Sequence, residues 1–299
     1  MRSILETLQT GKILVSDGAW GTMLQRYGLK AGECPEEWCL THPDVVENIA
    51  RQYREAGADL IETNSFGGSR IKLNQFGLGK KAGELNRAAA EISRRIAGQE
   101  VFVLGSVGPT GKMLIMGEVT EEEIYQSFKE QVMALEAGGV DAICIETMLD
   151  LQEALLAIRA ARENTRLEVI CNMTFEKGAK GQYNTVMGIS PAQFVQAAVE
   201  AGATIVGSNC GNGIERMIEI TRELRRSNPT VPIMIQSNAG LPRMQGGNLV
   251  YPETTEFMSS HIPALIEAGA NIVGGCCGTD PSYIKAFAEV VKNLNQNLP

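Results

Sequence analysis

The chain has 299 residues, of which 44% are hydrophobic, and its formal net charge is −8 at pH 7. This acidic balance argues against a nucleic-acid-binding protein and against one that binds anionic membrane surfaces, because both partners attract basic patches. No segment approaches the roughly 20 consecutive apolar residues that span a bilayer. Residues 1–6 lack the apolar core of a signal peptide. We therefore expect a cytoplasmic protein that binds neither nucleic acid nor membranes.

In chain order, short unbroken apolar runs alternate with segments of helical periodicity. Unbroken runs are typical of parallel strands that are buried on both faces. Eight strands are predicted, at residues 12–17, 59–64, 101–106, 142–146, 168–172, 204–208, 233–237 and 271–274. Eight helices are predicted, at residues 43–55, 81–97, 121–138, 149–164, 191–201, 214–227, 254–268 and 281–294. The two longest stretches without either pattern, 21–42 and 177–190, are expected to be loops.

Local signals support these helices. Thr120 and Glu123 form a capping-box pattern, and Pro191 and Pro281 each follow a capping residue at a first helical position. Four helices end in Glu-Ala-Gly just before the next strand, which predicts a C-terminal glycine cap at Gly57, Gly138, Gly202 and Gly269. Eight βα units predict a (β/α)8 TIM barrel that forms a single domain over residues 1–299. A doubly wound open sheet is the alternative, because periodicity alone does not show closure.

Three cysteines follow predicted strands, at the end of a barrel where active sites lie. Cys210 follows the sixth strand, and the adjacent Cys276 and Cys277 follow the eighth. Neighbouring cysteines do not easily form a relaxed disulfide with each other, but flanking glycines allow both thiols to point into one pocket. Three converging thiolates make a soft site that suits zinc and leaves a fourth position open for chemistry.

The other cysteines and the histidines have simpler interpretations. Two cysteines within apolar runs are expected to be small buried hydrophobic residues: Cys144 and Cys171. The Cys-x4-Cys pair formed by Cys34 and Cys39 is weak evidence for a metal. The two histidines of the chain fall in helical contexts and are not expected to be ligands: His42 and His261.

Polar residues at the other strand ends also allow more than one interpretation. Residues 105–111 resemble a phosphate loop but lack its Lys-Ser/Thr ending, so a structural turn is favoured. Asp17 and Glu146 are the last residues of the first and fourth predicted strands. Each is either a helix cap or satisfied rim carboxylate, or a group with a direct role in the site.

Five motifs in order along the chain are distinctive. They are Asp-Gly-Ala-Trp-Gly-Thr at 17–22, Thr-Asn-Ser-Phe-Gly at 63–67, Gly-Pro-Thr-Gly at 108–111, Glu-Thr at 146–147 and Gly-Gly-Cys-Cys-Gly-Thr at 274–279. Together they resemble the homocysteine S-methyltransferase family over nearly the whole chain. The resemblance implies a (β/α)8 barrel enzyme that transfers a methyl group to a thiol.

The resemblance also implies roles for individual residues. Carried over, the zinc ligands are Cys210, Cys276 and Cys277, with Asn238 as a fourth ligand when substrate is absent. Homocysteine would bind zinc as a thiolate and attack the methyl group, with no catalytic side chain beyond the zinc site. The ammonium and carboxylate of homocysteine would be held by Asp17, Glu146 and backbone N–H groups around Gly18 and Ala19.

The methyl donor is predicted from the same resemblance. Residues 237–242 and 276–281 are most similar to the homocysteine domain of cobalamin-dependent methionine synthase. Relatives that use a sulfonium usually carry arginine where Gly278 stands, and relatives that use betaine carry tyrosine where Gly67 aligns. Aromatic residues are only 5% of the chain, so an aromatic cage for a quaternary ammonium is poorly supplied. We expect methylcobalamin or a methylated corrinoid protein, acting as a co-substrate.

Alternatives remain open at this stage. Cobalamin-dependent synthases are longer, and no Asp-x-His-x-x-Gly cobalamin motif follows the predicted barrel. Residues 186–191 also depart from the threonine-rich phrase of such synthases, so we expect a stand-alone enzyme served by a separate corrinoid protein rather than an isolated domain. A second hypothesis is a thiol methyltransferase that uses S-methylmethionine or a betaine. A third is a thiol-rich metal-binding protein without catalytic activity.

Overall fold

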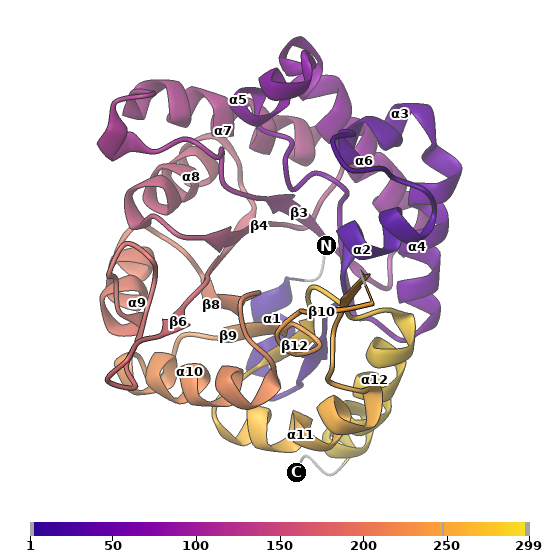
Figure 1. Cartoon of the computed structure of the whole chain (residues 1–299), viewed down its shortest axis with the longest axis vertical. Coiled ribbons are helices and arrows are strands. Elements are labelled where there is room, and N and C mark those ends of the chain that lie inside the picture. The colour runs from indigo at the N-terminus through magenta and orange to yellow at the C-terminus, as the bar shows by residue number, and fades with distance from the viewer. Residues whose placement is uncertain (1–2, 247, 297–299) are drawn as a thin grey trace.

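The computed structural model describes residues 3–246 and 248–296. The predicted domain, 1–299, also includes residues 1–2, 247 and 297–299, which lie outside the described residues. Within the described chain, eight parallel strands form one sheet that closes on itself, and helices surround it (Figure 1). The fold is a (β/α)8 barrel, as predicted, and the open doubly wound sheet is excluded.

The barrel strands run in the order β1-β12-β9-β8-β5-β4-β3-β2. Their bounds are β1 (Leu14–Val15), β2 (Leu60–Glu62), β3 (Phe102–Val107), β4 (Ala142–Met148), β5 (Glu168–Met173), β8 (Ile205–Asn209), β9 (Ile233–Ser237) and β12 (Ile272–Gly275). A parallel bridge between Ser16 and Leu60 joins the first strand to the second. The N–H of Asp17 also donates to the Leu60 carbonyl at 3.0 Å. These contacts close the barrel.

All eight predicted helices are present. They are α4 (Pro43–Glu55), α6 (Ala82–Ala97), α7 (Glu121–Ala137), α8 (Leu151–Asn164), α9 (Pro191–Glu200), α10 (Ile214–Ser227), α11 (Thr255–Glu267) and α12 (Pro281–Asn295). The capping box of Thr120 and Glu123 forms as expected. Glycines with positive φ follow three helix ends where predicted, but after α7 the left-handed residue is Gly139, whereas Gly138 is right-handed. Within the described residues, no helix has both the length and the apolar character needed to cross a bilayer.

Several short elements were not predicted. They are α1 (Ile4–Gln9), α2 (Trp20–Arg26), α3 (Trp38–Thr41), α5 (Arg70–Leu73), the 3-10 turns Pro35–Glu37, Asn74–Phe76, Gly79–Lys81 and Leu114–Met116, and two hairpins, β6 (Glu176–Lys177) with β7 (Tyr183–Asn184) and β10 (Arg243–Gln245) with β11 (Asn248–Val250). The segment 21–42, expected to be a loop, is therefore largely helical. Such short helices carry too few turns for apolar periodicity to identify them.

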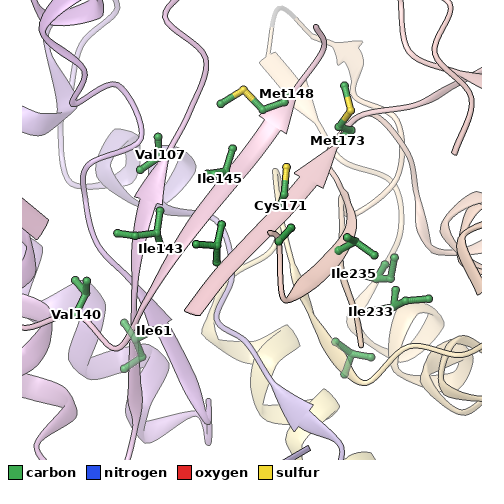
Figure 2. Close-up of a cluster of buried hydrophobic side chains, with 14 of the residues drawn as sticks. Ile61, Val107, Val140, Ile143, Ile145, Met148, Cys171, Met173, Ile233 and Ile235 are labelled. Carbon is green, nitrogen blue, oxygen red and sulfur yellow. The ribbon is translucent and has the colours of Figure 1, made fainter. Parts of the chain in front are cut away.

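Alternation along each strand divides the buried side chains into two layers. Ile143 and Ile145 of β4 pack outward against the helices, together with Ile233 and Ile235 of β9 (Figure 2). Inward-facing residues form a second apolar cluster inside the barrel, and Leu8 of α1 belongs to this cluster. Helix α1 thus covers the amino-terminal end of the barrel, where the Leu5 N–H donates to the Glu168 carboxylate.

Polarity changes along the barrel axis in a way that positions the site. The apolar layer inside the barrel includes Leu60 and Met234. Because side chains alternate, the next inward residue on each strand is two positions later. That residue is Glu62 on β2 and Gln236 on β9, and the two are hydrogen-bonded. The barrel interior therefore becomes polar toward the carboxyl ends of the strands.

Candidate active site

A cavity of about 250 Å³ opens at the carboxyl ends of the barrel strands. Its walls come from the turn after β1 and from the ends of β2, β3, β4, β8, β9 and β12. Pro35 and Glu36 also line it, so the segment between α2 and α3 covers part of the cavity. The Gly67 N–H donates to Glu36 Oε1 at 2.6 Å, which ties this segment to the loop after β2.

The three predicted cysteine ligands meet on one wall of this cavity. The Sγ atoms of Cys210, Cys276 and Cys277 all lie within 4.8 Å of one another, and those of Cys210 and Cys277 are 3.8 Å apart. Cys210 adopts φ 59°, a left-handed conformation that a non-glycine residue rarely adopts. The Cys210 N–H donates to the Gln236 carbonyl at 3.2 Å, and the Cys276 N–H donates to the Ser237 carbonyl at 2.8 Å. Strand β9 thus supports both cysteine-bearing turns.

The three thiols strongly influence one another. Hydrogen bonds from Cys276 and Cys277 lower the pKa of Cys210 to about 3. The hydrogen bond that Cys277 shares with Cys210 raises the pKa of Cys277 to about 11, and the corresponding contact raises that of Cys276 as well. Within the cluster, Cys210 is therefore the sulfur whose ionisation is favoured most. A bound cation would allow more than one sulfur to be ionised.

Asn238 follows β9 and lies beside the cysteines. Its side chain is 3% exposed and hydrogen-bonds Cys210. Its Oδ1 atom is buried without a hydrogen-bond partner among the described residues. A buried orphaned oxygen is costly unless something binds it. Three sulfur donors next to one unpartnered oxygen form a donor set that fits a tetrahedral zinc ion.

Tyr251 also contacts this cluster, and no local sequence pattern indicates that contact. Its side chain hydrogen-bonds Cys277, and burial together with the neighbouring thiols raises the pKa of Tyr251 to about 12. The tyrosine also covers Gly278, since a Cβ atom built on that glycine would lie 2.2 Å from Tyr251 Cγ. Gly278 has φ +86°, so both its conformation and its surroundings require a glycine.

Three buried carboxyl groups lie deeper in the same region: Asp17, Glu62 and Glu146. Glu146 and Glu62 line the cavity and are each 6% exposed. The Ser106 hydroxyl and the Asn209 amide donate to Glu146. Burial raises the pKa of Glu146 to about 7, and burial followed by the charge of Glu146 raises the pKa of Glu62. No role for Glu62 was predicted; its position directly after a buried apolar run was the only available signal.

The structure places Asp17 behind the cavity wall. It is fully buried, and its Oδ2 accepts from the Trp20 indole N–H and the Glu62 N–H, both at 2.9 Å. Burial, followed by the charge of Glu62, raises its pKa. Gly18 and Ala19 do line the cavity. The Ala19 N–H donates to Thr279 Oγ1 at 3.3 Å, and the Ala19 carbonyl accepts from the Tyr53 hydroxyl.

Asn209 joins the carboxyl groups to the cysteines. Its amide accepts from the Thr147 N–H at 2.7 Å, and donates to Glu146 Oε2 at 3.1 Å and toward Cys276 Sγ at 4.0 Å. Thr147 has φ 58°. Thr147 and Cys210 are the only non-glycine residues with positive φ in the described chain, and both line the cavity. Such strained residues cluster at functional sites.

The remaining candidates lie outside this site. Cys144 and Cys171 are fully buried, as predicted. The described residues contain one cluster of potential metal ligands, and Cys34 and Cys39 are not part of it. The loop at 105–111 is a structural turn, because both the N–H and the hydroxyl of Thr110 donate to Glu153 Oε1.

Several known proteins are similar to this chain in sequence. Residues 14–291 match the family described as homocysteine S-methyltransferase. Methionine synthase of Mycobacterium tuberculosis (strain ATCC 25618 / H37Rv) is 32% identical over 303 residues, which cover 95% of this chain and 25% of that protein. Methionine synthase of Mycobacterium leprae (strain TN) is 32% identical over 311 residues, covering 98% and 25%. The chain thus spans about a quarter of the length of these relatives.

Solved structures share the fold. The metallated form of the homocysteine methyltransferase MmuM from Escherichia coli has a TM-score of 0.80 and 21% identity, covering 95% of this chain and 98% of that one. A methyltransferase from Methanosarcina mazei has a TM-score of 0.58 and 10% identity, covering 95% and 94%. At these identities the likeness concerns the barrel and not its activity.

Proposed function

Because this chain belongs to the homocysteine S-methyltransferase family, we propose that it is a zinc-dependent enzyme that methylates homocysteine to methionine. The donor in this proposal is a methylcorrinoid, either methylcobalamin or a methylated corrinoid protein. The observation that carries the proposal is the convergence of three cysteine Sγ atoms within 4.8 Å of one another on the wall of a cavity that also holds buried carboxyl groups.

In this proposal Cys210, Cys276 and Cys277 would hold the zinc, and Asn238 Oδ1 would be a fourth ligand in the absence of substrate. Bound there, zinc supplies a positive charge that keeps a thiol ligand ionised at neutral pH, where a free thiol is mostly protonated. The residue network supports a fixed arrangement of the ligands. The Ala239 N–H donates to the Cys277 carbonyl at 3.0 Å, and the Asn238 N–H donates to the Asn212 carbonyl at 3.0 Å.

The amino acid end of homocysteine is assigned to the opposite wall. Glu146 binds the ammonium group, and the turn at Gly18 and Ala19 faces the carboxylate. Asp17 contributes by orienting β2 and the Trp20 indole through the hydrogen bonds described above. A cavity of about 250 Å³ is large enough for a small amino acid. The cysteine wall and the Glu146 wall then contact opposite ends of the same substrate.

Two glycines support a donor other than a betaine or a sulfonium. A Cβ atom on Gly67 would lie 2.8 Å from Glu36 Oε1, so the space that a tyrosine would need is filled by the Glu36 carboxylate. The space beside Gly278 is filled by Tyr251 in the same way. The tyrosine and the arginine that would mark the other two donor classes therefore lack space at these two positions.

The surroundings of the cavity support a macromolecular donor. Large exposed apolar side chains are concentrated in the loops that follow the barrel strands, and include Met113, Ile115, Met116, Val186, Met187, Leu241 and Met244. Ile115 is 74% exposed, and Met116 and Met244 are each 70% exposed. Exposed apolar surface of this kind is typical of contact sites for proteins. A corrinoid protein would approach the cysteine wall from this side.

A methyl-transfer assay on the zinc-loaded chain tests the proposal. Homocysteine is combined in separate reactions with methylcobalamin, S-methylmethionine and betaine, and methionine is quantified. Methionine formed with methylcobalamin alone, and lost in Cys210→Ser, supports the proposal. Methionine formed only with S-methylmethionine or betaine would overturn the donor assignment. Tight zinc binding without turnover of any donor would instead favour a non-catalytic metal-binding protein.

A further inference from the structure

Glu62 and Glu146 form a pair of buried acids without a cationic partner. Their carboxyl groups are close enough to share a hydrogen bond. Two neighbouring carboxylates repel each other, so a cation bound between them would favour the ionised form of both. None of the residues that line the cavity is lysine, arginine or histidine, and all of these residues belong to the described chain. The protein itself therefore supplies no countercharge at this wall.

Glu62 is held firmly in position. Gln236 Nε2 donates to Glu62 Oε1 at 2.8 Å, and the Cys144 thiol approaches the same oxygen at 3.8 Å. Gln236 is itself held by the Asn172 amide at 3.4 Å. Both contacts use Oε1, and the Glu146 carboxyl group contacts the same side chain. A carboxylate fixed in this way is pre-organised for recognition.

The position of this pair relative to the cysteines defines what it can recognise. Glu62 and Glu146 extend from β2 and β4, whereas the thiols follow β8 and β12, and all of them line the same cavity. A ligand that spans the cavity therefore meets sulfur donors at one end and two carboxyl groups at the other. An ammonium group satisfies both carboxyl groups, since it carries the missing positive charge and three hydrogen-bond donors.

We infer that Glu62 is a specificity-determining residue which, together with Glu146, binds the α-ammonium group of the acceptor thiol. The inference rests on the proposed function of this cavity and adds a second carboxylate to it. It has a direct consequence for substrate selection. A thiol that lacks an amino group would leave the acidic pair without a countercharge, and would bind less tightly than the corresponding amino thiol.

Calorimetric binding of two thiols to the zinc-loaded protein tests this inference. The probes are L-homocysteine and 4-mercaptobutanoate, which has the same thiol and carboxylate but no amino group. Glu62→Gln retains side-chain size and hydrogen bonding while removing the charge. We expect this variant to lose about tenfold in affinity for homocysteine, and to change by less than about twofold for 4-mercaptobutanoate. Glu153→Gln is the control, because Glu153 is a buried glutamate that does not line the cavity. This variant should keep the wild-type ratio of the affinities for homocysteine and 4-mercaptobutanoate.

The outcomes separate the inference from the proposed function. Equal losses of affinity for both thiols in Glu62→Gln would show that Glu62 has a structural role. Unchanged affinity for both thiols would show that Glu62 has no role in binding. Either result would overturn the inference. Failure of the wild-type protein to bind homocysteine would instead overturn the proposed function. If Glu62→Gln does not fold, Glu62→Asp keeps the charge but shortens the side chain. Glu62→Asp should then lower the affinity for homocysteine more than the affinity for 4-mercaptobutanoate. An unchanged ratio of these two affinities would contradict the inference.

Discussion

The side-chain amide of Asn209 donates to Glu146 Oε2 at 3.1 Å, and so joins the end of β8, directly before Cys210, to β4, which carries the buried acid. These two residues are 63 positions apart in the sequence. Through this contact, the wall that carries the thiols and the wall that carries the carboxyl groups share one hydrogen-bond network. The effects of substitutions at the two walls are therefore expected to be energetically coupled, and double-mutant cycles would measure this coupling.

The cysteine cluster should determine the zinc content. Replacing Cys210, Cys276 or Cys277 with serine should lower zinc well below one ion per chain after dialysis against a chelator, because a serine hydroxyl is a poor zinc ligand. Methyl transfer should fall by on the order of 100-fold or more, since the metal lowers the barrier by several kcal/mol. Metal analysis of the purified variants checks this. Cys171→Ala is the control, and should retain zinc while losing about 1 kcal/mol of stability.

Asn238→Ala should weaken zinc binding by on the order of tenfold when homocysteine is absent, as expected for loss of a group that contacts or supports the metal. With saturating homocysteine the difference should disappear, because the substrate thiol would occupy the fourth position. Chelator competition measured with and without homocysteine distinguishes the two states. Equal weakening in both conditions would mean that Asn238 is not replaced by substrate.

Gly278→Ala should destabilise the fold considerably more than an alanine substitution at another glycine with a similar φ. A Cβ atom on Gly11 (φ +83°) would have no neighbouring atom within 4 Å, whereas one on Gly278 (φ +86°) would lie 2.2 Å from Tyr251 Cγ. We expect Gly11→Ala to cost about 1–2 kcal/mol from backbone strain alone. Gly278→Ala should cost more, and should also weaken zinc binding because Tyr251 must move from Cys277. Urea unfolding together with zinc titration of both variants tests this, and equal effects would contradict the packing argument.

The pKa of Glu146, about 7, predicts a pH dependence of stability. A glutamate in the unfolded chain ionises near pH 4.5. Between that pH and about 7 the folded state binds more protons, so the free energy of unfolding should decrease as pH rises. The decrease attributable to this group is at most about 3–4 kcal/mol, at about 1.4 kcal/mol per pKa unit.

Urea unfolding of the metal-free protein between pH 5 and 8 measures this dependence. Glu146→Gln should give a shallower pH profile, because the substituted side chain does not ionise. Glu200→Gln, at an exposed glutamate, should reproduce the wild-type profile. Parallel profiles for the wild type and Glu146→Gln would show that this carboxyl group does not titrate in the range.

Most of the barrel could be predicted from local sequence. Unbroken apolar runs identified every barrel strand, and apolar periodicity identified the eight long helices, because both signals depend only on the backbone period of one element. Closure could not be predicted in this way. It depends on the pairing of Ser16 with Leu60 and on α1 filling one end of the barrel, which are contacts between elements.

The same distinction applies to the site. The sequence by itself predicted that Cys210, Cys276 and Cys277 would meet at one end of the barrel, because their residue type and their place after strands are local properties. Only the tertiary structure shows that Glu62 meets Gln236, 174 positions away, and that Tyr251 covers Gly278. Which side chains share a cavity is decided by the register of neighbouring strands and the path of the loops. Those are long-range packing choices that no local pattern in the sequence encodes.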